Sequence, residues 1–249
     1  MIDPNDDLAF AKKPYRTVAC IPVKGRGPLV EQTIKRLYWK NDVYRVICVG
    51  DEREDREVCE KAGAVWVQFN NKPLGSKWNA AFEEAKKYEP DACLYVGSSD
   101  WLSGNWIDFM RPHVDQNHLV GVPGMYLVDV SAANGRRGVF WPGYDLKHRN
   151  ESIGIGRMLS RELLDKLKWR PFEGQADQSL DRSMTDKCAR FGNKEFMLQN
   201  PQMMALSLSF PDRWPNKHRF DMHWHNMLPS QKIDVEPFLT THFPEIFDI

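Results

Sequence analysis

A short polar segment with a single carboxylate follows an apolar run near the middle of the chain. Residues 93–96 are apolar and come directly after a Pro-Asp breaker, so they predict a buried strand. Gly97, Ser98, Ser99 and Asp100 follow this strand. Open α/β sheets bind their ligands at the carboxyl ends of strands, which makes Asp100 a candidate ligand-binding residue. The alternative is that Asp100 caps a turn, the commoner role of Asp in such a loop.

A second group of acidic residues, Glu173, Asp177 and Asp181, surrounds the start of a helix predicted over residues 178–189. In the simplest interpretation, Asp177 caps this helix and Asp181 is a solvated residue one turn further on. The histidines of the C-terminal part lack nearby Cys ligands, so a structural zinc site is not expected there. No dinucleotide fingerprint, Walker A loop or Gly-x-Ser-x-Gly nucleophile motif occurs at the required spacing.

Strands and helices alternate through the first hundred residues, and this alternation predicts how the candidate residues are positioned. Four strands joined by helices indicate an α/β fold with a parallel sheet and helices on both faces. The polar loops after the four strands should then meet along one edge of the sheet. The predicted strands are residues 17–23, 45–49, 64–69 and 93–96, and the loops after them are 24–27, 50–52, 70–75 and 97–100. The predicted helices contain Val30, Ile34 and Leu37, then Val58 and Ala62, then Trp78, Ala81, Phe82 and Ala85 behind a Ser76 cap.

The second half of the chain is less regular. A short helix over residues 105–110 is expected to stop before Pro112, and Ser160 is expected to cap a helix through Leu167. Further strands are predicted over 119–122, 125–130, 139–141 and 203–210, with a hairpin turn at Asn134-Gly135 and a loop over 142–155. We expect a lead-in (1–14), one domain (15–210) and a C-terminal extension (211–249).

The composition is that of an ordinary globular protein. Lys+Arg and Asp+Glu each number 34 among 249 residues, and the zero net charge gives no support to salt-driven binding of nucleic acid or anionic membrane. The acidic N-terminus lacks the apolar core of a signal peptide, and no apolar run is long enough to cross a bilayer. Five scattered cysteines indicate a reducing compartment without a disulfide framework. We therefore expect a soluble, cytoplasmic protein.

The order of the motifs along the chain carries a resemblance to a known family. A basic segment follows the first strand at residues 21–26, and an acidic residue ends the second at 49–51. The sequence Leu-Gly-Ser-Lys-Trp-Asn-Ala-Ala occupies 74–81, and carboxylates follow at 97–100 and 174–180. In this order the predicted domain resembles the glycosyltransferase-A (GT-A) fold, and within it the inverting family 2-like glycosyltransferases that use nucleotide-diphosphate sugars. The resemblance implies a single Rossmann-like domain with a mostly parallel central sheet flanked by helices, plus the C-terminal extension.

The resemblance also implies roles for the residues that match its motifs. Asp51 would hydrogen-bond the nucleobase beside the backbone of residues 22–24, while Lys77 and Arg26 would meet the phosphates. Asp177 would be the general base that deprotonates the acceptor hydroxyl for in-line attack, with Glu173 and Asp181 as fallback bases. The implied donor-binding set is Pro22, Val23, Lys24, Arg26, Asp51, Lys77, Asn79, Ser98 and Ser99.

Asp100 stands at the family's metal-binding Asp-x-Asp motif and would bind Mn²⁺ or Mg²⁺, which stabilises the diphosphate leaving group. This chain departs from the family pattern at two positions. Ser98 replaces the first carboxylate of that motif, and Ala176 replaces the Glu of the Glu-Asp pair that ends in Asp177. The missing carboxylate implies either a lower metal affinity or a metal shell that His218 completes, as a late His does in several related transferases.

The acceptor and two alternative functions remain open from the sequence. Trp141, Tyr144 and Arg149 would form the acceptor wall, since aromatic rings stack on sugars or bases, and a core role is the alternative for Trp141. The acceptor would be a glycan, a protein or a modified nucleic-acid base. The basic loop at 24–27 is also similar to that of sugar-phosphate nucleotidyltransferases, which consume a nucleoside triphosphate. The missing carboxylate also fits a non-catalytic carbohydrate- or nucleotide-binding protein on a degenerate transferase fold.

Overall fold

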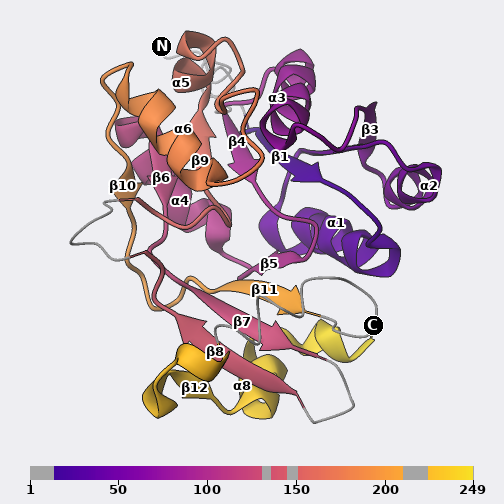
Figure 1. Ribbon diagram of the computed structural model, residues 1–249, viewed down its shortest axis with the longest axis vertical. Helices are drawn as coiled ribbons and strands as arrows, with labels where there is room; N and C mark the ends of the chain where they lie inside the picture. The colour runs from indigo at the N-terminus through magenta and orange to yellow at the C-terminus, as the bar shows by residue number, and fades with distance from the viewer. Residues whose placement is uncertain (1–13, 131–135, 145–150, 210–223, 249) are drawn as a thin grey trace, which may run out of the picture.

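The structure, a computed structural model, describes residues 14–130, 136–144, 151–209 and 224–248. Within these residues the chain forms a seven-stranded and a five-stranded sheet with helices around them (Figure 1). In spatial order, the larger sheet consists of β10 (Phe196–Met197), β6 (Leu119–Gly121), β9 (Met158–Ser160), β4 (Ala92–Tyr95), β1 (Thr17–Pro22), β2 (Arg45–Gly50) and β3 (Val65–Gln68).

The larger sheet is mainly parallel, which confirms the predicted α/β class. Strand β1 lies between β2 and β4 and pairs in parallel with both. Strand β9 pairs antiparallel with β4 and with β6. Its three residues lie just after the predicted loop, and a run this short shows no readable apolar period.

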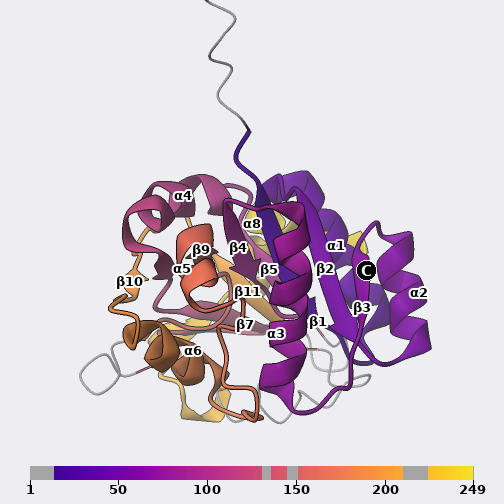
Figure 2. The same ribbon diagram turned by 90° about the horizontal axis from the view of Figure 1, so that it is seen from above.

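Helices cover both faces of the larger sheet, as Figure 2 shows. Alternate residues of β1 point to opposite faces: Ala19 and Ile21 join one core cluster, and Val18 and Cys20 join the other. Side chains of α1 (Gly27–Asn41), α2 (Arg53–Lys61) and α4 (Trp106–Asn117) contribute to the first cluster. Side chains of α3 (Leu74–Ala85), α5 (Arg161–Lys166) and α6 (Leu180–Ala189) contribute to the second.

The apolar periods predicted for two of these helices are confirmed. The predicted faces of α1 and α3 are buried, and Ser160 caps α5 by accepting a hydrogen bond from the Leu163 amide. Helix α3 begins at Leu74, so Ser76 lies inside its first turn and the prediction that Ser76 is the cap was wrong. Pro73 occupies the capping position in an extended conformation and has no side-chain oxygen to offer.

The prediction that a helix stops before Pro112 was wrong, because α4 continues through Pro112 to Asn117. A proline inside a helix removes one backbone hydrogen bond. Trp106, Met110 and Val114 on one face of α4 are fully buried, so the packing of this face outweighs the lost bond.

The five-stranded sheet consists of β12 (Lys232–Ile233), β8 (Arg137–Trp141), β7 (Met125–Asp129), β11 (Ala205–Ser209) and β5 (Asp100–Leu102). Strands β7 and β8 pair antiparallel, and the predicted Asn134-Gly135 turn between them lies outside the described residues. Strand β5 begins at Asp100 and pairs antiparallel with β11, so the chain passes from the first sheet to the second at the candidate residue.

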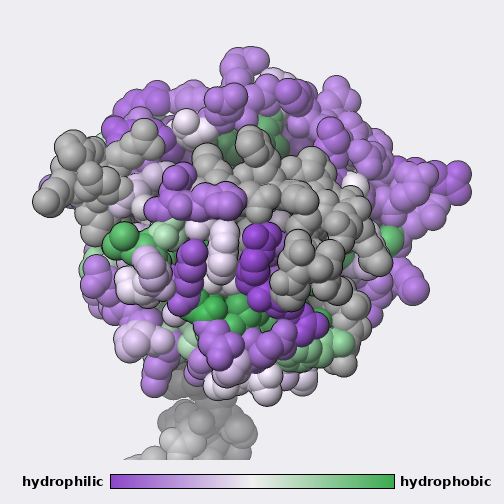
Figure 3. Space-filling model, turned by 60° about the horizontal axis from the view of Figure 1, so that its bottom comes forward, coloured by the Kyte–Doolittle hydropathy of each residue, from purple (hydrophilic) through white to green (hydrophobic). Residues whose placement is uncertain are grey.

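The described part of the predicted C-terminal extension packs on this second sheet. Strand β12 pairs with β8, and α8 (Val235–His242) buries Val235 and Leu239 in a third core cluster. In the following short helix (Pro244–Asp248), Glu245 forms an ion pair with Arg36 of α1. The surface on this side is mainly hydrophilic and carries a small apolar patch (Figure 3). In the part of the chain that the structure describes, no helix has the length and apolarity needed to cross a bilayer.

Burial on α1 predicts a contrast in stability along one helix. Replacing the fully buried Ile34 with Ala should lower the free energy of unfolding by about 2–5 kcal/mol, because the lost methyl groups leave a cavity in the core. Trp39 on the same helix is 72% exposed, and Trp39→Ala should cost less than about 1 kcal/mol. Urea unfolding monitored by circular dichroism measures both, and equal losses would contradict the assigned face of α1.

Candidate functional site

A cavity of about 610 Å³ opens at the carboxyl ends of β1 and β4, next to the starts of α3 and α6. This volume is in the usual range for a small-molecule site. Three of the four predicted loops contribute to its wall, the exception being residues 50–52. The sequence-predicted residues that line it are Pro22, Val23, Lys24, Arg26, Lys77, Ser98, Ser99, Asp100, Tyr144, Asp177 and Asp181.

Asp100 forms part of a tight turn at the floor of the cavity. Its Oδ2 accepts a hydrogen bond of 2.9 Å from the Gly97 amide, and its own amide donates to the Gly97 carbonyl at 3.1 Å. A Cβ atom on Gly97 would lie 2.4 Å from this carboxylate oxygen, so a larger residue there would displace the Asp100 side chain. The structure therefore shows the turn-capping role of Asp100, and metal binding by the same carboxylate stays a prediction.

Arg26 lies beside this turn and brings a positive charge into the cavity wall. Its guanidinium donates to Ser99 Oγ at 2.5 Å. Burial lowers the pKa of Arg26, and the nearby Asp100 carboxylate partly offsets this. Arginine nevertheless stays protonated at every physiological pH.

The basic loop that carries Arg26 is held by a residue that the sequence analysis missed. The buried carboxylate of Asp55 in α2 accepts hydrogen bonds from the Gly25 amide at 2.7 Å and from the Arg26 amide at 3.3 Å. Gly25 has φ = +61°, a conformation that favours glycine. Asp55 lies among other charged residues of α2, and such a residue is normally expected to face solvent. No pattern in the sequence therefore indicates its contact with the basic loop.

Lys77 is 2% exposed and connects two of the loops that line the cavity. Its ammonium donates to the Val23 carbonyl at 2.6 Å and to Asn71 Oδ1. Asn71 in turn donates its backbone amide to Asp51 at 3.1 Å, and its side-chain amide also donates to the Asp51 carboxylate. Burial lowers the pKa of Lys77 to about 8, although the nearby Asp51 and Asp55 oppose this shift.

Two residues of the predicted donor-binding set lie away from the cavity lining. Asp51 is exposed and contacts the cavity through Asn71, which does line it. Asn79 is buried against Phe172: its Nδ2 donates to the Phe172 carbonyl, and its Oδ1 accepts from the Phe172 amide, both at 3.0 Å. The assignment of either residue to a nucleotide sugar stays a prediction.

Asp177 and Asp181 line the α6 side of the cavity. Asp177 is exposed, and its Oδ1 accepts a 2.8 Å hydrogen bond from the Leu74 amide at the start of α3. Asp177 therefore does cap a helix, but the helix is α3 and not α6 as the sequence predicted. Among the fallback bases, Glu173 pairs with Arg190 outside the cavity lining, whereas Asp181 lies in the lining.

Asp181 is fixed by two donors from the connection between β8 and β9. Its Oδ2 accepts from the Tyr144 hydroxyl at 2.9 Å and from the Gly154 amide at 2.8 Å. Burial and the negative charge of Asp181 both raise the pKa of Tyr144, so this phenol stays protonated. Trp141 meets Tyr144 edge-on with ring centroids 5.3 Å apart and lies outside the cavity lining, and Arg149 and His218 lie outside the described residues.

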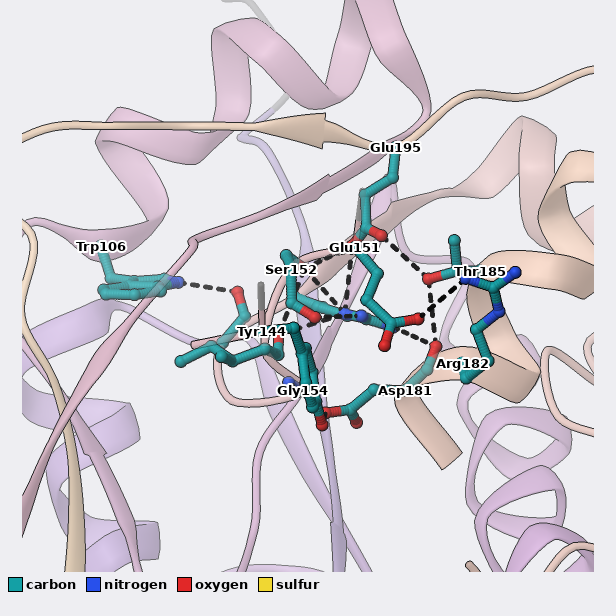
Figure 4. Close-up of polar contacts among 12 residues, drawn as sticks. Trp106, Tyr144, Glu151, Ser152, Gly154, Asp181, Arg182, Thr185 and Glu195 are labelled. Atoms are coloured by element: carbon teal, nitrogen blue, oxygen red, sulfur yellow. Dashed lines mark hydrogen bonds and ion pairs between the residues drawn. The ribbon is translucent and has the colours of Figure 1, made fainter. Parts of the chain in front are cut away.

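Behind Asp181 lies a buried polar network, drawn in Figure 4. The fully buried Arg157 contacts Glu195 at 3.1 Å and donates to the Asp181 carbonyl at 2.8 Å. Ser152 and Thr185 also donate hydrogen bonds to Glu195. The network fixes the first turn of α6, which carries Asp181.

Comparisons with known proteins bear on the fold. No protein-family model and no curated protein sequence matches the chain. Residues 1–349 of TarS from S. aureus match its structure with a TM-score of 0.50 and 14% identity, over 78% of this chain and 60% of that one. A mycobacterial protein matches with a TM-score of 0.46 and 15% identity, over 78% and 65%. The chain thus spans less than two thirds of either protein, and identities this low bear on the fold alone. The fold is therefore similar to that of TarS residues 1–349.

The buried ammonium of Lys77 predicts a pH dependence of stability. Between a folded pKa of about 8 and an unfolded value of 10.5, only the unfolded chain binds this proton, so stability should rise with pH in that window. The free energy of unfolding of the wild type, relative to Lys77→Met, should increase by up to about 3 kcal/mol from pH 8 to 10.5. Urea titrations measure this difference. The exposed Lys61→Met should show no such trend, and a flat difference for Lys77→Met would contradict the buried ammonium.

Proposed function

We propose that this protein is a glycosyltransferase that moves a sugar from a nucleotide-diphosphate sugar to an acceptor hydroxyl, with inversion at the anomeric carbon. One observation carries the proposal: a single cavity is lined both by positive side chains and by carboxylates. The positive side chains are Lys24, Arg26, Lys72 and Lys77, and the carboxylates are Asp100, Asp177 and Asp181. The glycosyltransferase-like fold supports the same function.

The positive side of the cavity suits a diphosphate. Lys24 and Lys72 are exposed and free to move toward a ligand, whereas Arg26 is held by Ser99. A planar guanidinium binds two phosphate oxygens at once, which makes Arg26 the best oriented phosphate donor in the lining. The loop of Asn71 lies next to the same wall, within reach of the nucleoside.

The carboxylates of the lining suit a general base. In the proposed reaction, the acceptor oxygen bonds to the anomeric carbon as the bond from that carbon to the β-phosphate oxygen breaks. The electron pair of the broken bond leaves with the diphosphate, and the acceptor proton moves to a carboxylate oxygen of Asp177. Asp181 already accepts two hydrogen bonds on one oxygen, so Asp177 is the more available base.

The predicted metal ion would bind at Asp100 and the residues around it. Mn²⁺ and Mg²⁺ prefer several oxygen ligands, and Mg²⁺ is usually held by one or two carboxylates together with waters and substrate phosphates. Asp100 accepts the Gly97 amide, Ser99 accepts the Arg26 guanidinium, and no group of three or more His, Cys, Asp or Glu within the described ranges is placed to hold a metal. These residues alone do not fit a divalent cation. We assign no step to a metal, and the Mn²⁺ or Mg²⁺ requirement stays a prediction.

The acceptor half of the cavity is partly aromatic. Tyr95, Tyr144 and Asp181 all line it, and aromatic rings can pack against sugar faces while a carboxylate accepts hydrogen bonds from sugar hydroxyls. We therefore rank a glycan above a protein or a modified nucleic-acid base as acceptor. The two carboxylates also make this half unfavourable for a phosphate group.

A two-step experiment tests the proposal. Nucleoside diphosphates and nucleotide-diphosphate sugars should raise the melting temperature of the wild type by about 5–10 °C at a hundredfold excess over Kd. Asp177→Asn should keep this shift but lower the transfer rate by about 10²–10⁴-fold, because it removes the base and leaves the positive wall intact. Asp186→Asn, an exposed carboxylate of α6 outside the cavity lining, is the matched control and should retain full activity.

Running the same panel with and without Mn²⁺ tests the metal prediction. A shift that requires Mn²⁺ would support it, and an equal shift in EDTA would contradict it. Stabilisation by a nucleoside triphosphate alone, with pyrophosphate release, would replace the proposal with a nucleotidyltransferase. Full transfer activity in Asp177→Asn would remove Asp177 as the base.

A further inference from the structure

Helix α3 begins without a cap of its own. The first amides of a helix have no partner inside the helix and need acceptors from elsewhere. Pro73 precedes α3 and provides no side-chain oxygen, and the first intrahelical bond runs from the Lys77 amide to the Pro73 carbonyl at 3.1 Å. The amides of Leu74, Gly75 and Ser76 therefore depend on another part of the chain.

A segment about one hundred residues later supplies all three acceptors. The Leu74 amide donates to Asp177 Oδ1 at 2.8 Å, and the Gly75 amide donates to the Ala176 carbonyl at 2.7 Å. The Ser76 amide and hydroxyl both donate to the Gly174 carbonyl, at 3.1 and 2.8 Å. Residues 174–177 thus supply the hydrogen-bond acceptors that the first amides of α3 need.

Two side-chain choices on α3 fit this contact. A Cβ atom on Gly75 would lie 2.1 Å from the Glu173 carbonyl oxygen, so only glycine allows this close approach. One turn further, Asn79 exchanges two hydrogen bonds with the backbone of the fully buried Phe172. Residues 172–177 are therefore fixed to α3 at both ends.

We propose that Gly75, Ser76 and Asn79 are positioning residues that hold the loop of Asp177 in place. This inference rests on the proposed function for the role of Asp177 as base. In this role Asn79 holds the loop and does not bind the nucleotide sugar, in agreement with its position outside the cavity lining. Lys77, between Ser76 and Asn79, faces the opposite way toward the Val23 carbonyl, so one helix start fixes both halves of the cavity.

Hydrogen exchange followed by mass spectrometry tests the contact without any reaction. In Asn79→Ala, peptides covering residues 172–178 should exchange about tenfold faster than in the wild type, because two of the bonds that fix the loop are gone. Glu84→Gln on the same helix, which alters only a surface pair with Lys87, should leave them unchanged. Unchanged exchange in Asn79→Ala would overturn the inference.

Kinetics then test whether the contact acts through Asp177. Gly75→Ala should lower kcat about 10²-fold while the Kd for the nucleoside diphosphate stays within twofold, because a displaced base affects the chemical step alone. In an Asp177→Asn background the same change should cause no further loss. Ser76→Ala, which keeps the backbone bonds, is the milder variant if Gly75→Ala does not fold.

Three results would overturn the inference or separate it from the proposed function. Losses that add in the double variant would show that Gly75 does not act through Asp177. A Kd that weakens in proportion to kcat would place the segment in the donor site instead. If the wild type turns over no nucleotide sugar while Asn79→Ala still frees the loop, the proposed function fails and the loop contact stands.

Discussion

A lysine ammonium that is taken out of water must find acceptors, and Lys77 finds them in the Val23 carbonyl and the Asn71 side chain. This requirement ties the end of β1 to the loop after β3, with α3 as the anchor. Removing the Asn71 acceptor would leave the buried ammonium with fewer hydrogen bonds, and an unmet donor on a buried charge costs more than an ordinary hydrogen bond contributes. The shape of the positive side of the cavity follows from this interaction.

The start of α3 also determines where Asp177 lies. Its first amides are satisfied by residues 174–177, which carry Asp177 to the cavity. Asp181 is held separately, by Tyr144 and Gly154 in front and by the Arg157–Glu195 pair behind. A cavity lined by both positive and negative side chains therefore rests on networks of buried polar contacts, whose members support one another.

The first hundred residues could be predicted well because their apolar periods are long and regular. The order of strands and helices up to β4, and the buried faces of α1 and α3, came from that signal. Strands β5 and β9 could not be predicted, because three residues do not establish a period. Contacts such as Asp55 with Gly25, Asn79 with Phe172 and Arg157 with Glu195 join residues 30 or more apart, and no local pattern records them. The cavity could be placed from topology, but the bonds that shape it could not.

A crystal structure of Asp177→Asn with a bound nucleotide-diphosphate sugar would test the central claim most directly. We expect the diphosphate to lie against Arg26, with Lys24 or Lys72 folded over it. We also expect the anomeric carbon to face residue 177, with space between them for an acceptor hydroxyl. A diphosphate bound outside this cavity, or with its phosphates toward Asp181 and its sugar toward Arg26, would contradict the assignment of the two walls.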